Sequence, residues 1–285
     1  ATLEDILNQY PDISIPDNIN DSLESCKNAG GPDQVLACTV IRNPDLSKED
    51  KTRIINSVAE IGYAAGAMAM AFNEDPMAAD SIEGRLSMKA EAFNRDGSMK
   101  DGSTGLWVDV LGSWTNADSY SVTGNADIGY DADSYGIIMG VDHKLKDKNV
   151  ILGGAFSYTD GNLTSTGDLL ETKNAFKTFG IHAYGAWKPS EKTNLVGMLS
   201  YLRSASEASQ KLPSAAGFGS ASADIDTDLF VAGVRGEMLF NVSDNVQIVP
   251  HLGARMIVGS TDGYDTKLAG GKAYGNDADL PTTSQ

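Results

Sequence analysis

Residues 179–188 read FGIHAYGAWK, and apolar residues alternate along them with small or polar ones. Phe179, Ile181 and Trp187 fall on one side of an extended chain and His182 falls on the other, because successive side chains of a strand point to opposite faces. Alternation with a period of two predicts a β-strand that is apolar on one face only.

The same alternation recurs between residues 105 and 259 and predicts a series of antiparallel strands. The predicted strands are 105–115, 132–144, 150–160, 175–188, 194–203, 225–240 and 246–259. The short connections between them are 145–149, 189–193 and 241–245. The long connections, which are rich in aspartate, are 116–131, 161–174, 204–224 and the residues after 260. Short and long connections therefore alternate along the chain. This is typical of a barrel in an outer membrane, with tight turns on one side and long loops on the other.

The pattern alone leaves open which face of each strand is inside. A water-soluble antiparallel sheet would bury the apolar face, and that alternative stays open. Glycines on the polar face and aromatic residues near the strand ends favour a membrane barrel, whose interfaces carry aromatic girdles. The candidate girdle residues are Trp107, Trp114, Tyr158, Trp187 and Tyr201.

Composition argues against several function classes. The net charge of −17 over 285 residues would repel a phosphate backbone, so no nucleic-acid partner is expected. The histidines lie in predicted strands, there is no Gly-x-Ser-x-Gly motif, and the cysteines and histidines lack zinc spacing. We therefore expect no enzyme activity, no metal and no cofactor. Asp224, Asp226 and Asp228 offer oxygen ligands for calcium, but a solvated acidic loop is the favoured interpretation because the full calcium-loop pattern is missing.

The residues before the strands predict helices and turns. Prolines interrupt 1–46 repeatedly, whereas Ser47 can cap a helix over 47–73 that Pro76 would end, with a weaker helix over 76–93. Ala1 begins a segment with neither a basic start nor an apolar stretch, so no signal peptide is visible and the chain is expected to be processed or part of a longer one.

Both cysteines of the chain precede the strands. A disulfide between Cys26 and Cys38 would close a small loop and suits the periplasm or the cell exterior. Two reduced core thiols are the alternative.

Several glycine- and aromatic-rich stretches, taken in order over residues 82–267, resemble the translocator domains of autotransporters (type V secretion). These stretches are GRLS (84–87), GLWVDVLGS (105–113), YGIIMGVD (135–142), LGGAFSYTDG (152–161) and VPHLGAR (249–255), followed by Gly263 and Tyr264. The resemblance implies a mainly β fold, a transmembrane β-barrel of twelve strands of which about seven are present, with an α-helical linker in its pore.

The resemblance also implies a function and a division of the chain. The barrel would anchor and help export an N-terminal passenger, with the long loops at the cell surface. The expected partners are outer-membrane lipid and lipopolysaccharide, the barrel-assembly machinery and the covalently linked passenger. Residues 1–46 would be the passenger end or connector, 47–103 the helical linker or pore segment, and 104–285 the partial barrel.

This sequence departs from the family in two respects. The family's last strand, which ends in an aromatic residue, is missing, so a truncated chain is expected. No Asn-Asn pair lies in 47–93, so no self-cleavage of the linker is expected. Two other functions stay open: a surface adhesion protein that binds through acidic extracellular loops, and an enzyme whose active site lies in an upstream passenger.

In such a barrel the polar faces of the strands would line the pore and pair with the helical segment. The candidate pore-lining residues are Asp109, Asp142, His182, Arg235, Glu237, His251 and Arg255. Their expected partners on the pore segment are Glu60, Glu83, Arg85 and Lys89. A hydrated polar lining with no specific partner is the alternative, since ion pairs that touch water contribute only ~0–1 kcal/mol each.

Overall fold

The computed structural model describes residues 39–41, 43–88, 102–120, 127–243, 246–269 and 277–280. Cys26, Cys38 and Lys89 lie outside these ranges, so the predictions for them remain predictions.

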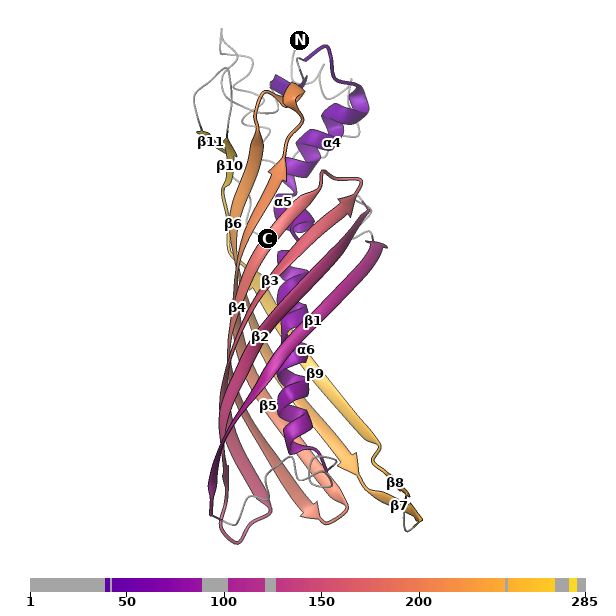
Figure 1. Cartoon of the computed structure of the whole chain (residues 1–285), viewed down its shortest axis with the longest axis vertical. Coiled ribbons are helices and arrows are strands. Elements are labelled where there is room, and N and C mark those ends of the chain that lie inside the picture. Colours follow the sequence, from indigo (N-terminus) through magenta and orange to yellow (C-terminus); the bar gives the residue numbers. More distant parts are fainter. Residues whose placement is uncertain are drawn as a thin grey trace.

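The dominant element is a tall antiparallel sheet that curves around a helix (Figure 1). Its long strands are β1 (Thr104–Tyr120), β2 (Ile128–Lys144), β3 (Val150–Gly167), β4 (Thr172–Ser190), β5 (Thr193–Lys211), β6 (Ser220–Met238) and β9 (His251–Thr261). Strands β1 to β6 pair in chain order, which confirms the predicted meander. Among the described strands β1 and β9 do not pair with each other, so the sheet forms an open half-barrel.

Strand β6 has two partners along its far edge. Its half near the short turns pairs with β9, as in Gly233 opposite Arg255. Its other half pairs with β10 (Thr266–Ala269), as in Ala221 opposite Leu268, and β10 in turn pairs with β11 (Asp277–Leu280).

The segments 161–174 and 204–224, predicted as long loops, are mostly strand, so that part of the prediction is wrong. Strands β5 and β6 stay paired as far as Lys211 opposite Ser220, and only a short turn that contains the 3₁₀ helix Ser214–Ala216 joins them. Strands β3 and β4 likewise pair as far as Ser165 opposite Thr172. One face of these segments is exposed and polar, and the other face buries small apolar residues together with uncharged polar ones such as Ser165, Thr172 and Gln210.

At the opposite end, the prediction is confirmed for the tight turn at 145–149, since β2 ends at Lys144 and β3 begins at Val150. The single strand predicted over 246–259 is wrong. Strand β8 (Val246–Ile248) forms a separate hairpin with β7 (Phe240–Ser243), and β9 begins only after Pro250. Proline has no N–H for a sheet ladder, which accounts for the break.

Within residues 43–88, three helices lead into the sheet: α4 (Lys48–Ala59), α5 (Ile61–Ala64) and α6 (Ala67–Leu86). The Ser47 cap is confirmed, because its Oγ accepts a hydrogen bond from the Asp50 N–H at 3.0 Å. None of the helices in the described ranges is both long and apolar enough to cross a membrane.

The prediction that Pro76 ends the helix is wrong, since Pro76 lies inside α6. The chain breaks instead at Gly66, whose φ of 60° lies in the left-handed region that glycine adopts readily. Proline inside a helix costs about 3 kcal/mol, so the contacts of α6 with the surrounding sheet must outweigh that cost.

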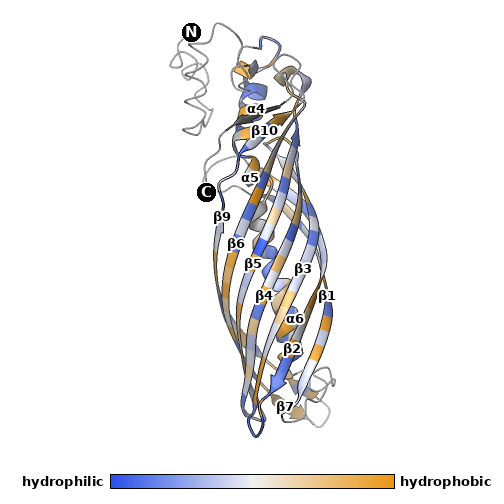
Figure 2. Ribbon diagram, turned by 90° about the vertical axis from the view of Figure 1, so that its left-hand side faces the viewer, coloured by the Kyte–Doolittle hydropathy of each residue, from blue (hydrophilic) through white to orange (hydrophobic). Residues whose placement is uncertain are grey.

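Near the short turns, the apolar face of the strands points away from the helix. Ile181 is 63% exposed and Leu252 is 83% exposed, whereas the charged ends of Arg235 and Arg255 point toward α6. Figure 2 shows the resulting alternation of hydropathy along each strand. A water-soluble sheet would bury the apolar face, so this arrangement suits hydrocarbon outside the sheet.

An aromatic residue points outward from each of the strands β1 to β6. This aromatic belt consists of Trp114, Tyr135, Tyr158, Phe179, Tyr201 and Phe230. The ring centroids of Tyr158 and Phe179 lie 4.9 Å apart, and those of Tyr201 and Phe230 lie 5.0 Å apart. Trp187 also points outward and is 53% exposed, nearer the short turns. The prediction for Trp107 is wrong, because its indole N–H points inward and donates to Asp142 and Tyr184.

Candidate functional site

Helix α6 presents two acidic side chains to the far edge of the sheet, one below the other. Asp75 and Glu83 are eight residues apart on α6, which places them about two turns from each other. The facing strands supply two arginines, Arg235 on β6 and Arg255 on β9. Alternate residues of a strand share a face, so Glu237 also points inward beside Arg235.

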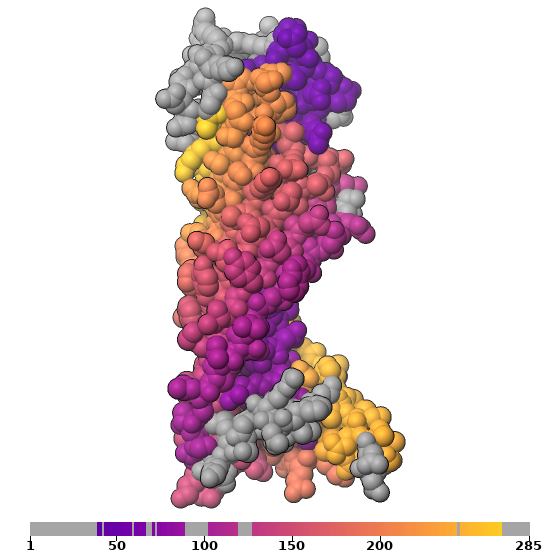
Figure 3. All heavy atoms as spheres, viewed as in Figure 1, coloured from indigo at the N-terminus to yellow at the C-terminus, as the bar shows by residue number. Residues whose placement is uncertain are grey.

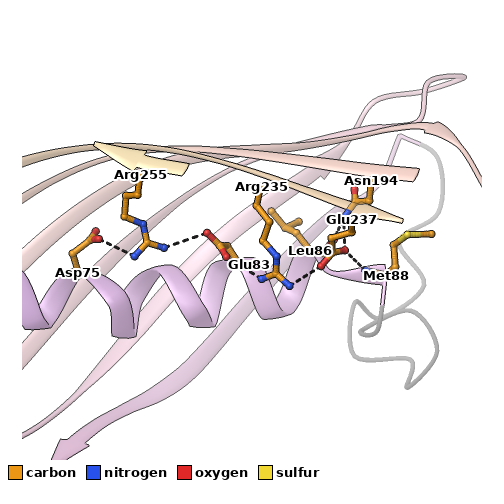
Figure 4. A network of polar contacts seen from close by, with 8 residues as sticks. All are labelled: Asp75, Glu83, Leu86, Met88, Asn194, Arg235, Glu237 and Arg255. Carbon is orange, nitrogen blue, oxygen red and sulfur yellow. Dashed lines mark hydrogen bonds and ion pairs between the residues drawn. The ribbon is translucent and has the colours of Figure 1, made fainter. Parts of the chain in front are cut away.

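These side chains form a continuous chain of ion pairs (Figure 4). Arg255 bridges the helix positions, with its Nη1 3.2 Å from Asp75 Oδ2 and its Nη2 3.2 Å from Glu83 Oε1. Arg235 then joins Glu83 Oε2 at 2.9 Å to Glu237 Oε1 at 2.8 Å. We call these five residues the ion-pair chain.

The ion-pair chain ends by fixing the last turn of α6. Glu237 is 3% exposed, and its Oε2 accepts hydrogen bonds from the Met88 N–H at 2.8 Å and from Asn194 Nδ2 at 3.1 Å. Asn194 Nδ2 also donates to the Leu86 carbonyl at 2.9 Å. Backbone groups at a helix end lack partners within the helix, so these contacts stabilise the end of α6.

A second polar cluster contacts α6 from strands β1, β2 and β4, away from the edge formed by β6 and β9. Asp142 on β2 is 1% exposed and accepts hydrogen bonds from Arg85 Nε, from the Tyr184 hydroxyl and, at 3.1 Å, from Trp107 Nε1. The Arg85 guanidinium lies 5.4 Å from the centroid of the Trp107 ring, within the range of a cation–π contact. Arg85 is thus held by both a carboxylate and an aromatic face.

The other predicted pore-lining residues lie on the inner face without joining these clusters. Asp109 is exposed at the edge strand β1 and accepts a hydrogen bond from Ser81 of α6 at 2.7 Å. His182 is 2% exposed and lies between Ser157 and Ser200, at 2.9 and 2.8 Å. His251 is exposed on β9, opposite Glu237 in the strand register.

Sequence reasoning missed several members of the site. Asp75, Asn194 and Tyr184 were not among its candidates. Asn194 lies opposite Glu237 in the pairing of β5 with β6, so only the exact register brings the two together. Among the expected helix partners, Glu83 and Arg85 contact the sheet, whereas Glu60 lies between α4 and α5, outside both clusters.

No part of the described chain brings together three or more His, Cys, Asp or Glu side chains that could hold a metal ion. The acidic residues of β6 have cationic neighbours instead. Asp226 pairs with Arg203 at 2.7 Å, Asp228 with Arg203 at 3.6 Å, and Asp224 with Lys267 at 3.0 Å. The ion-pair chain and the Asp142 cluster hold α6 by charge and hydrogen bonds.

A model of the autotransporter beta-domain family matches residues 106–282. Among solved structures, the chain is similar to the translocator domain of autotransporter NalP from Neisseria meningitidis, with 16% identity and a TM-score of 0.43 over 73% of this chain and 67% of that chain. No curated protein matches the chain.

Proposed function

Because the chain belongs to the autotransporter beta-domain family, we propose that it anchors a covalently linked N-terminal passenger in the outer membrane and helps to export it. The family is a transport and secretion domain of the outer membrane, not an enzyme family. Export of a passenger by this particular chain is the further step that we propose.

One observation carries the proposal: a helix lies along the inner side of a sheet whose outer face is apolar. The ion-pair chain and the Asp142 cluster hold α6 from different strands, so the helix is fixed as a plug. Asp142, Arg235, Glu237 and Arg255 are thereby proposed as pore-lining residues that position the helix, and Asp109, His182 and His251 as polar lining.

The direction of the helices suggests the orientation. From α4, at the end where β5 and β6 turn, the chain runs through α6 to the end with the short turns and there enters β1 (Figure 1). We propose that the α4 end faces the cell surface and the short turns face the periplasm. Residues 1–46 would then be the passenger end or connector, 47–103 the linker, and 104–285 the partial barrel.

The proposed partners follow from this setting. Outer-membrane lipid and lipopolysaccharide would meet the apolar outer face below the aromatic belt, and the barrel-assembly machinery would insert the strands. The alternative of adhesion through long acidic loops gains no specific support, because the segments expected as loops are largely paired strand.

An epitope at the N-terminus of the full-length protein tests the proposal. We expect a protease added to intact cells to remove the epitope, while the barrel stays in the outer-membrane fraction and needs detergent for extraction. A barrel found in the soluble fraction would overturn the proposal, as would an epitope that becomes accessible only after the cells are opened.

A further inference from the structure

Beyond the aromatic belt, the strands change character. Between the aromatic belt and the short turns, the inner face of the sheet carries the ion pairs. The ends of β5 and β6 on the other side of the belt bury apolar side chains instead. Ala208, Ala221, Ala223 and Ile225 are each at most 1% exposed there. The outer face of the same strand ends carries exposed charges such as Glu207 and Lys211. These ends are therefore built like a water-soluble protein, apolar inside and polar outside.

Helices α4 and α5 cover this apolar surface. We call α4, α5 and the strand ends that pack on them the cap. Its buried apolar residues include Ile54, Ile55, Val58 and Ile61 from the helices, and Ala208, Leu212, Phe218, Ala221, Ala223, Ile225, Tyr264 and Leu268 from the sheet side. Figure 3 shows α4 in indigo beside the orange turn between β5 and β6, at one end of the molecule.

Polar contacts from several strands seat α4 in the cap. Ser57 is their centre, since its Oγ accepts from the Leu170 N–H at 2.8 Å and its carbonyl accepts from Gln210 Nε2 at 2.9 Å. Arg53 Nη2 donates to the Leu169 carbonyl at 3.0 Å. Arg53 and Ser57 are one turn apart on α4, so this face of the helix is held along its length.

Hydrogen bonds also hold the end of the cap that leads into α6. The Tyr264 hydroxyl accepts from the Gly62 N–H at 3.2 Å, and a Cβ at Gly62 would lie 2.4 Å from that oxygen. Asn174 Nδ2 donates to the Ala65 carbonyl at 2.8 Å. The left-handed Gly66 then separates the cap from α6, so different residues hold the two parts of the linker.

We propose that the strand ends of the cap form a second binding site for the linker, which closes the mouth of the pore independently of the ion-pair chain. Its ligand is the amphipathic helix α4 of the same chain, recognised by an apolar inner surface and by donors on β5 and in the β3–β4 turn. This inference rests on the proposed function, because a closed mouth has meaning only for a pore.

Thiol labelling on intact cells tests the cap. In full-length protein with Cys26→Ser and Cys38→Ser, a reporter cysteine replaces Ser204, which is 1% exposed on the inner face of β5 just below the cap. A second reporter, Ser209→Cys, lies on the exposed outer face of β5. A membrane-impermeant maleimide is added outside the cells, and its rate of reaction is measured at each reporter.

We expect rapid labelling at Ser209→Cys and slow labelling at Ser204→Cys. Ile55→Asp, which buries a charge under α4, should speed labelling at Ser204→Cys about tenfold or more by opening the cap. Glu49→Asp, on the exposed side of the same helix, is the control and should leave the rate unchanged. Phe218→Ser, at the far turn between β5 and β6, is the second cap variant, chosen because it lies away from the pore.

The outcomes separate the two proposals. If Ser209→Cys is not labelled on intact cells, the proposed orientation and function fail. If Ser209→Cys is labelled but Ser204→Cys reacts equally fast in the unsubstituted cap, the cap does not close the mouth. The cap proposal is also overturned if neither Ile55→Asp nor Phe218→Ser speeds the reaction in protein that reaches the surface.

Discussion

At the scale of single residues, Arg235 is the centre of the site because it joins a helix carboxylate to a strand carboxylate. Its side chain is 15% exposed, and the side chains of Glu83 and Glu237 that it pairs with are 14% and 1% exposed. Charges buried to this degree depend on their partners, since water does not replace a missing one.

Arg235→Gln should therefore weaken the folded barrel strongly. The substitution leaves Glu83 and Glu237 without their shared cation, and breaking a buried pair costs about 3–5 kcal/mol. Denaturant unfolding of the protein in detergent measures the loss. Arg203→Gln is the matched control on the outer surface, where the pair with Asp226 is half exposed and the expected loss is about 0–1 kcal/mol. Equal losses for the two variants would contradict the assigned role of Arg235.

Glu74 is a charge without such a partner. It is 2% exposed on α6, and neither carboxylate oxygen has a hydrogen bond of good geometry among the described residues. Glu74→Gln should stabilise the protein by about 1 kcal/mol or more, because it removes an unpaired buried charge and keeps the shape. The midpoint of thermal unfolding should rise. A lower midpoint would mean that the neighbouring hydroxyls of Ser134 and Thr159 stabilise the carboxylate.

At the scale of the elements, the linker is divided by glycine rather than by proline. Proline is the strongest helix breaker in a sequence, so a reading of the chain alone ends the helix at Pro76. That reading fails because contacts with the surrounding sheet hold α6 together through Pro76. Gly66 gives no comparable signal in the sequence, because glycine is common in this chain.

Two glycines of the same region should respond oppositely to alanine. Gly66→Ala places a Cβ in the left-handed region and 2.9 Å from Leu163 Cδ1, so it should destabilise the fold by about 1–2 kcal/mol. Gly84→Ala lies in α6 with nothing within 4 Å of the new Cβ and should stabilise it by up to about 1 kcal/mol. Denaturant unfolding of both variants checks the pair, and a gain from Gly66→Ala would contradict the hinge.

Alternation of polar and apolar residues predicts the strands near the short turns but not the strand ends in the cap. The strands near the short turns alternate strongly because lipid and pore differ sharply in polarity. The strand ends in the cap alternate small apolar residues such as Ala221 and Ala223 with serine and aspartate, a contrast too weak to separate strand from loop. Their strand character comes from pairing with each other, and α4, which lies far away in the sequence, covers their inner face.

At the scale of the whole molecule, the barrel class was predictable and the pairing of distant residues was not. The polarity of the two faces and the three short turns indicate an outer-membrane meander. The ion-pair chain needs the register of β6 with β9 and the rotation of α6 about its axis, so Asp75 and Asn194 cannot be found from spacing alone.

The cap should also respond to pH as a unit. Burial raises the pKa of Glu60 above its usual 4.5, and the pKa of Tyr264 is raised mainly by burial and also by the neighbouring Glu60. A raised pKa means that the closed cap binds the proton more tightly than the open linker does. The resulting stability is complete below pH 4.5 and is lost as pH rises through the raised pKa of Glu60.

Hydrogen exchange in residues 48–64 should accordingly be slower at pH 4.5 than at pH 7, after correction for the intrinsic rate. Glu60→Gln should remove the difference and slow exchange at pH 7. Exchange in α6 serves as the internal control. A pH response that survives in Glu60→Gln would assign it to another group.

The divided edge of β6 has a mechanical consequence. Strand β6 is continuous. One half of it pairs with β9, and the other half, in the cap, pairs with β10. If the chain carries a passenger as proposed, a force on the passenger would reach the cap through α4 and load β6 along its axis. The ladder bonds lie across this direction, so they are loaded in shear and share the force instead of opening one at a time. A force on the cap would thus be shared by the paired strands β6, β9 and β10 before it reaches α6.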